Sequence, residues 1–133
     1  MRKTILQLIT DTAAVAAEIP AERWYQASSV VETPQKPFGI YRISGTGGGV
    51  TKRGPGRQVR LEVWIHDKPG SYLRIDKLLT EVESTFAAAV HASAAEGESI
   101  SQADFDSRSP DLDDQGFGSI CKSSIFTLVG KGQ

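Results

Sequence analysis

The stretch Gln58-Val-Arg-Leu-Glu-Val-Trp-Ile-His66 decides the fold, because apolar residues occupy every second one of its positions. The two alternating sets are Val59, Leu61, Val63 and Ile65, and Arg60, Glu62, Trp64 and His66. Successive side chains of a β-strand point to opposite faces of a sheet. The alternation therefore predicts a strand with one face in a hydrophobic core and the other toward solvent, as in antiparallel sheets.

Three further strands are predicted around this one. Residues 38–44 contain β-branched and aromatic side chains, which favour strands, and residues 100–107 and 119–129 share this character. The connections are a long glycine-rich segment at residues 45–57 and an acidic turn at residues 109–116. Both are short enough to join antiparallel neighbours as hairpins.

Two amphipathic helices are predicted as well. Residues 3–17 place apolar side chains at three- and four-residue steps, and Pro20 ends this helix because proline lacks the backbone amide. Ser71 can cap a second helix, from residue 72 to about residue 92. The apolar stripe of that helix consists of Ile75, Leu78, Leu79, Val82 and Phe86.

The predicted order is helix, two strands, helix, two strands, within a single domain of residues 1–133. Residues 21–37 are expected to be irregular, with Trp24 and Tyr25 anchored against the body of the domain. Helices in such an order bury their apolar stripes against a sheet. The predicted fold class is α+β: a single, mostly antiparallel four-stranded sheet with two main helices packed on one face.

The composition excludes several classes of protein. With 133 residues, 39% of them apolar and 23% charged, the chain can bury a core without disulfides or metal. A formal net charge of −1 argues against a generally basic nucleic-acid-binding protein. The one cysteine, Cys121, excludes an intrachain disulfide and is expected to be a small apolar residue of a late strand. No stretch approaches the ~20 apolar residues of a membrane span, so no membrane partner is expected.

None of the chemical motifs is complete, so no catalytic residue, cofactor site or metal site is predicted. The glycine run of residues 45–49 lacks the third glycine and the following helix of a dinucleotide site. His66 and His91 share no metal-ligand spacing, and Gly116-Phe-Gly-Ser119-Ile lacks the Gly-x-Ser-x-Gly order of a nucleophile elbow. The acidic turn of residues 109–116 resembles half of a calcium loop without its final glutamate.

Charge is distributed unevenly along the chain. Between Thr33 and Leu61 there are six basic residues and no acidic one, and between Glu96 and Asp114 there are seven acidic residues and one basic residue. Such runs are commonly solvated faces, but two opposite patches on one small domain also suit a head-to-tail ring. The residues predicted for these inter-subunit patches are Arg42, Arg60, Asp104, Asp106, Asp111, Asp113 and Asp114.

The glycine-rich loop of residues 45–57 is predicted to bind a partner. Its one apolar residue, Val50, gives it little to pack on, so ordering it within its own subunit loses conformational entropy for little return. Lys52, Arg53 and Arg57 make the loop positive. We expect these three residues to contact another protein, and a loop without any role is the alternative.

Five phrases of the sequence, taken together with the order of the predicted elements, carry a resemblance to a known family. They are Pro37-Phe-Gly-Ile-Tyr-Arg-Ile43, Val59-Arg-Leu-Glu-Val-Trp-Ile-His66, Pro69-Gly-Ser-Tyr72, Leu73-Arg-Ile-Asp-Lys-Leu-Leu79 and Ser109-Pro-Asp-Leu-Asp-Asp-Gln115. In these phrases the chain resembles the tail terminator (tail completion) proteins of long-tailed bacteriophages, of the siphophage type. The resemblance covers about residues 3–130, and neither the loop of residues 45–57 nor the alanine-rich residues 87–95 contribute to it.

The resemblance implies a virion protein without catalytic activity or cofactor, assembled in the host cytoplasm. Its subunits would form a homohexameric ring at the head-proximal end of the tail, capping the tail tube protein and ending tube polymerisation. The ring would offer a docking surface to the head-tail connector protein. Genomic DNA would pass through the central channel without specific binding.

Three alternatives stay open. The nearest is a head-completion or stopper protein of the phage neck. A small enzyme or ligand-binding domain would hold His66, Asp67 and Cys121 together in a deep pocket. A nucleic-acid-binding α+β domain would use Lys52 and the neighbouring arginines, and its binding would depend strongly on salt.

Overall fold

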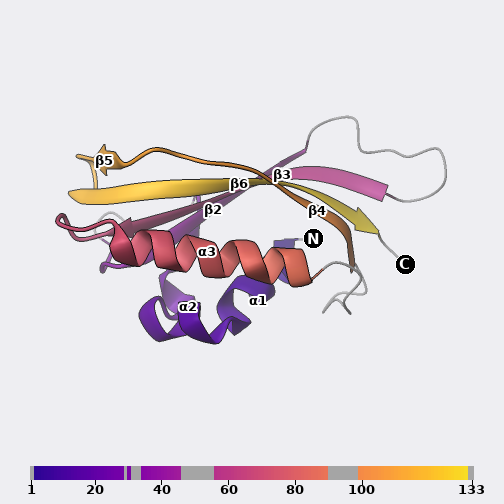
Figure 1. Ribbon diagram of the computed structural model, residues 1–133, viewed down its shortest axis with the longest axis horizontal. Coiled ribbons are helices and arrows are strands. Elements are labelled where there is room, and N and C mark those ends of the chain that lie inside the picture. Colours follow the sequence, from indigo (N-terminus) through magenta and orange to yellow (C-terminus); the bar gives the residue numbers. More distant parts are fainter. Residues whose placement is uncertain (1, 29, 31–33, 46–55, 90–98, 132–133) are drawn as a thin grey trace.

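The chain folds into one twisted sheet with its helices on one side (Figure 1). The structure, a computed structural model, describes residues 2–28, 30, 34–45, 56–89 and 99–131. In chain order the elements are α1 (Arg2–Asp11), α2 (Ala13–Glu18), a 3₁₀ turn (Ala21–Arg23), β1 (Trp24–Gln26), β2 (Phe38–Gly45), β3 (Gly56–Asp67), α3 (Leu73–Ala88), β4 (Ser99–Arg108), β5 (Leu112–Asp114) and β6 (Ser119–Lys131).

The strands follow the spatial order β1-β2-β3-β6-β4, and β5 pairs with the beginning of β6. Neighbouring strands are antiparallel except β1 and β2, which are parallel. The predicted α+β class is confirmed, and so are the four predicted strands. The predicted four-stranded sheet with two helices is wrong in detail, because the described residues form a mixed sheet of six strands with three α-helices.

The two additional strands are three residues each, too short to show an alternating pattern in the sequence. β1 lies in the segment predicted to be irregular, where Trp24 pairs with Gly39 of β2. β5 lies in the predicted acidic turn, where Leu112 pairs with Cys121. Both strands form because a longer strand offers them an unpaired edge, which is a tertiary cause.

The predicted first helix is also divided. Thr12 has an extended backbone (φ −72°, ψ 112°) between α1 and α2. Its hydroxyl donates a hydrogen bond to the Leu8 carbonyl over 2.9 Å and lies 2.8 Å from the hydroxyl of Thr85 on α3. Threonine competes with the helical backbone in this way, so the chain turns there. Pro20 follows the end of α2 as predicted.

The hydrophobic core lies between the sheet and the three helices. The predicted stripe of α3 is buried along its whole length, and Ile5, Ile9 and Val15 of the first two helices are fully buried as well. The ring of Phe86 contacts that of Phe126 on β6, at 5.2 Å between centroids. Each such buried side chain stabilises the fold by roughly 1.5–3 kcal/mol.

The start of α3 differs slightly from the prediction. The helix begins at Leu73, and the Ser71 hydroxyl accepts a hydrogen bond from the Leu73 amide over 3.2 Å. Tyr72 stands at the cap position without a side-chain cap. The helix ends at Ala88, and the predicted continuation beyond residue 89 lies outside the described residues.

Candidate interaction surface

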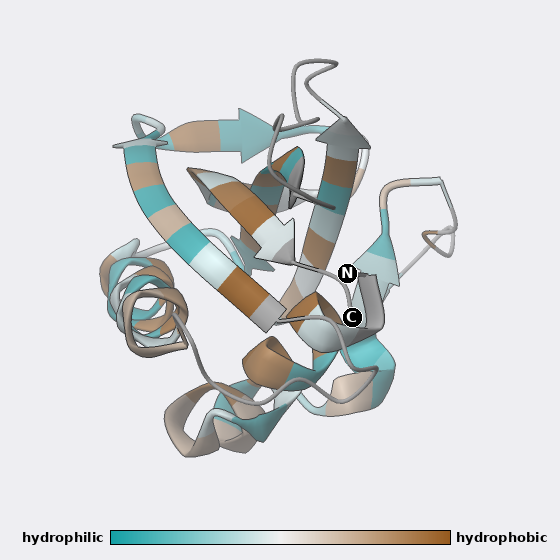
Figure 2. Cartoon of the chain, turned by 90° about the vertical axis from the view of Figure 1, so that its right-hand side faces the viewer, coloured by the Kyte–Doolittle hydropathy of each residue, from teal (hydrophilic) through white to brown (hydrophobic). Residues whose placement is uncertain are grey.

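The sheet has two faces of different character. Val59, Leu61, Val63 and Ile65 of β3 point toward the helices and are buried, as the alternation predicted. The intervening residues point to the other face, which no described helix covers (Figure 1). Figure 2 shows the resulting bands of hydrophobic and hydrophilic residues along the strands. We call this uncovered side, carrying Ile40, Arg42, Arg60, Glu62, Trp64, Ser123, Ile125 and Thr127, the open face.

On the open face, two exposed arginines and the aspartates of β4 lie on different strands. Arg42 of β2 and Arg60 of β3 are exposed. In register, Arg60 pairs with Thr127, and Thr127 pairs with Asp104 of the edge strand β4. Neighbouring strands are about 4.8 Å apart, so roughly 10 Å separate the backbone at Arg60 on β3 from that at Asp104 on β4. Asp106 is held at that edge by the Thr127 hydroxyl, which donates to its Oδ2 over 2.7 Å.

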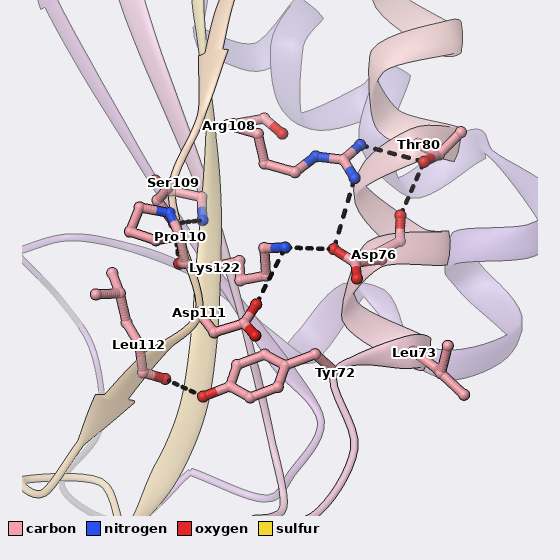
Figure 3. Close-up of polar contacts among 12 residues, drawn as sticks. Tyr72, Leu73, Asp76, Thr80, Arg108, Ser109, Pro110, Asp111, Leu112 and Lys122 are labelled. Atoms are coloured by element: carbon pink, nitrogen blue, oxygen red, sulfur yellow. Dashed lines mark hydrogen bonds and ion pairs between the residues drawn. The ribbon is translucent and has the colours of Figure 1, made fainter.

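The acidic turn, by contrast, is bound to other parts of its own chain (Figure 3). Lys122 Nζ lies 3.2 Å from Oδ1 of Asp111 and 2.7 Å from Oδ1 of Asp76 on α3. The Tyr72 hydroxyl donates a hydrogen bond to the Leu112 carbonyl over 3.0 Å. Asp111 is therefore already paired within the chain.

A second cation continues this network along α3. Arg108, at the end of β4, pairs with Glu83 at 2.6 Å and with Asp76 at 3.6 Å. The buried Ser124 hydroxyl donates to the same Oε2 of Glu83 over 2.7 Å. The network fixes the β4–β5 turn against α3, so its charges stabilise the fold of the chain itself.

We expect Asp76→Asn to lower the free energy of unfolding by about 1 kcal/mol. Asp76 meets two cations and lies in the first turn of α3, where a negative charge is favourable, but its side chain is 40% exposed, which screens both effects. Urea unfolding at low and high salt measures the change. The control is Glu81→Gln, because Glu81 lies on the same helix and has no ion pair among the described residues. Equal losses of stability for both variants would contradict a stabilising role for the ion pairs of Asp76.

A pocket of about 330 Å³ opens on the open face. Ile40 and Arg42 of β2 and Glu62 and Trp64 of β3 line it. The full lining is Ala27, Val30, Ile40, Arg42, Glu62, Trp64, His66, Asp114, Phe117 and Cys121. Its volume is at the small end of the range for ligand sites, roughly 300–1,000 Å³.

An aromatic cluster forms one end of this pocket. The imidazole of His66 stacks on the ring of Phe38, with 4.7 Å between the ring centroids, and Phe117 meets both rings edge-on. His66 Nδ1 lies 2.8 Å from the Ser119 hydroxyl. Burial lowers the pKa of His66 from 6.5 to about 4; the carboxylate of Asp114 opposes this shift and the charge of Lys36 adds to it. The ring is therefore neutral at pH 7.

The pocket does not assemble a catalytic constellation. It brings His66 and Cys121 together, but Asp67 points to the helix face, where its Oδ2 accepts a hydrogen bond from Arg74 Nε over 2.8 Å. Burial raises the pKa of the Cys121 thiol to about 11, and Asp114 and Asp113 add to this, so the nucleophilic thiolate is scarce. Ser119 is buried and does not line the pocket.

The described residues contain neither a metal-ligand cluster nor a membrane-spanning helix. No group of three or more histidine, cysteine, aspartate or glutamate residues there could hold a metal ion. No helix among them is long and apolar enough to cross a membrane.

The predicted loop contacts fall largely outside the described residues. Lys52 and Arg53 belong to residues 46–55, and His91 likewise lies in a part of the chain that the structure does not describe. Arg57 stands at the beginning of β3, where the structure describes its backbone position.

Sequence reasoning missed the pocket and one exposed aromatic residue. Phe105 on β4 is 49% exposed, although the centroid of its ring lies 5.8 Å from that of Phe126. Leu73, at the start of α3, is 78% exposed. The available signal for Phe105 was its place between Asp104 and Asp106, which keep that part of the strand at the surface.

Comparison with known proteins gives a result at the level of the fold. No protein-family model matches the chain, and no curated protein matches it. Among solved structures, a chain of the virion of the native gene transfer agent (GTA) particle is similar, with a TM-score of 0.71 and 12% identity. The match covers 99% of this chain and 95% of that chain. At this identity the likeness shows a shared fold.

Proposed function

We propose that the protein is a structural virion protein without enzymatic activity, which forms a ring on the tail tube of a phage-like particle. The ring ends tube polymerisation and provides the docking surface for the head-tail connector. The protein resides at the head-proximal end of the tail, and DNA passes through the ring without specific binding.

The observation that carries the proposal is the shared fold with a virion chain over 99% of this chain and 95% of that one. The charges of the open face support self-assembly, because the basic residues Arg42 and Arg60 and the acidic residues Asp104 and Asp106 belong to different parts of the sheet. A head-to-tail ring uses two such unlike surfaces.

Polymerisation of the tail-tube protein from the same genome tests this proposal. With the purified protein added, we expect shorter tubes in negative-stain images, each with a ring at one end. The same tubes without the protein are the control. Tubes of unchanged length without rings at their ends would contradict the proposed function.

The basic loop supplies a second arm of that experiment. We propose that Lys52, Arg53 and Arg57 contact the tube or the connector. A variant with residues 46–55 replaced by Asn-Gly is then expected to form rings that cap tubes poorly. If it caps tubes as the unmodified protein does, the loop has no part in the contact.

A further inference from the structure

The pocket on the open face and the exposed ring of Phe105 belong to different regions of the sheet. The pocket involves the segment that follows β1, with Ala27 and Val30, and Ile40 of β2. Phe105 lies on β4, which stands at the opposite end of the strand order. Its ring packs on Phe126, on the helix side, so it does not reach the pocket of its own chain.

We infer that Phe105 of one subunit inserts into the pocket beside Ile40 and Trp64 of the next subunit. Each copy then contributes one aromatic side chain and receives one, which is the heterologous contact that closes into a ring. The inference rests on the proposed function, since it names the contact by which the proposed ring assembles.

The chemistry of the pocket fits an aromatic side chain. Trp64 and Phe117 line it, and the stacked pair of Phe38 and His66 lies at one end. His66 is neutral at pH 7, so its ring places no charge against an apolar guest. Aromatic rings prefer edge-to-face contacts of the kind that Phe117 already makes within this cluster. A pocket of about 330 Å³ accommodates one side chain rather than an extended ligand.

Charged residues lie beside both surfaces. Asp104 and Asp106 flank Phe105. Arg42, which lines the pocket, is exposed and has no ion pair among the described residues, although Glu62 stands opposite it in the β2–β3 register. Glu62 and Asp114 also line the pocket and oppose an acidic guest. Asp114 is held in its own turn by the Phe117 amide, which donates to its Oδ1 over 3.1 Å. Arg42 is therefore the group expected to attract the incoming aspartates.

The irregular pairing of β4 favours a side-chain contact over a continuous inter-subunit sheet. Its register with β6 shifts between Ile100 and Gln102 and again between Phe105 and Ser107. Such bulges, together with charged side chains, discourage strand addition at a sheet edge.

Sedimentation of the full-length protein at a series of concentrations tests the contact. We expect Phe105→Ala to raise the concentration needed for half-assembly by about 30-fold or more, as removal of a central interface residue does. Leu73→Ala removes a more exposed apolar side chain elsewhere and is the matched control, with an expected change below about threefold. Arg42→Glu should weaken assembly at low salt, and combining it with Asp104→Arg and Asp106→Arg should restore it.

Covalent trapping identifies the two partners directly. In a Cys121→Ser background, which removes the only cysteine, Ile40→Cys together with Phe105→Cys should give disulfide-linked oligomers on a non-reducing gel. Ile40→Cys with Leu73→Cys should remain monomeric on that gel. Circular dichroism of each variant distinguishes a lost contact from a lost fold.

The outcomes separate this inference from the proposed function. Two results together would overturn the inference and leave the proposed function standing. Phe105→Ala would still form rings and cap tubes, and the variant that combines Ile40→Cys with Phe105→Cys would give no disulfide cross-link. A protein that neither self-associates nor caps tubes would overturn both. Cross-linking together with loss of rings in Phe105→Ala establishes the contact.

Discussion

Replacement of Gly39 by alanine is expected to lower the free energy of unfolding by about 2–3 kcal/mol, in the upper range for overpacking. Gly39 pairs with Trp24 across the parallel β1–β2 contact, and the indole lies directly over it. A Cβ built on Gly39 would be 2.2 Å from Cζ3 of Trp24, far inside van der Waals contact. Trp24 is 6% exposed, so its ring cannot swing into solvent without losing its burial.

Chemical denaturation of Gly39→Ala and of the unmodified protein measures this loss. Gly45→Ala is the matched control, because Gly45 belongs to the same strand and a Cβ there meets nothing within 4 Å. We expect that control to be neutral or slightly stabilising, since alanine restricts the unfolded chain. In a Trp24→Leu background, Gly39→Ala should cause no further loss of stability. If both glycine variants lose equal stability, the close approach of Trp24 is not the cause.

The second large effect is a loss of stability on acidification, caused by His66. Its pKa is about 4 in the folded protein and 6.5 when unfolded, because burial disfavours the imidazolium. The unfolded chain therefore binds the proton more readily. The stability that neutral His66 contributes is fully present above pH 6.5 and is lost as the pH falls toward 4. At pH 4.5 the loss amounts to about 2–3 kcal/mol.

Urea unfolding at pH 7 and at pH 4.5 measures this effect in the unmodified protein and in His66→Gln. The variant is less stable at pH 7, because it loses the stacking on Phe38. Its further loss on acidification should be smaller by about 2–3 kcal/mol, since the carboxylates titrate alike in both proteins. Equal losses on acidification would show that His66 is not protonated on unfolding.

The long elements of the fold could be predicted because their patterns are local. The alternation in β3 and the apolar stripe of α3 each determine which side chains face the core, and both are confirmed. The break at Thr12 and the strand β1 could not be predicted. Each depends on a partner far along the chain, Thr85 for the first and Gly39 for the second.

The same division holds for the candidate site. The sequence by itself determined that basic and acidic residues form separate groups and that no chemical motif is complete. The tertiary structure alone decided that Asp111 is paired with Lys122 while Asp104 and Asp106 lie at the exposed edge strand. It also decided that the pocket forms. His66 at its aromatic end lies within hydrogen-bond distance of Ser119, which is 53 positions further along the chain. Strand register creates such neighbours, and register depends on how the whole sheet packs against its helices.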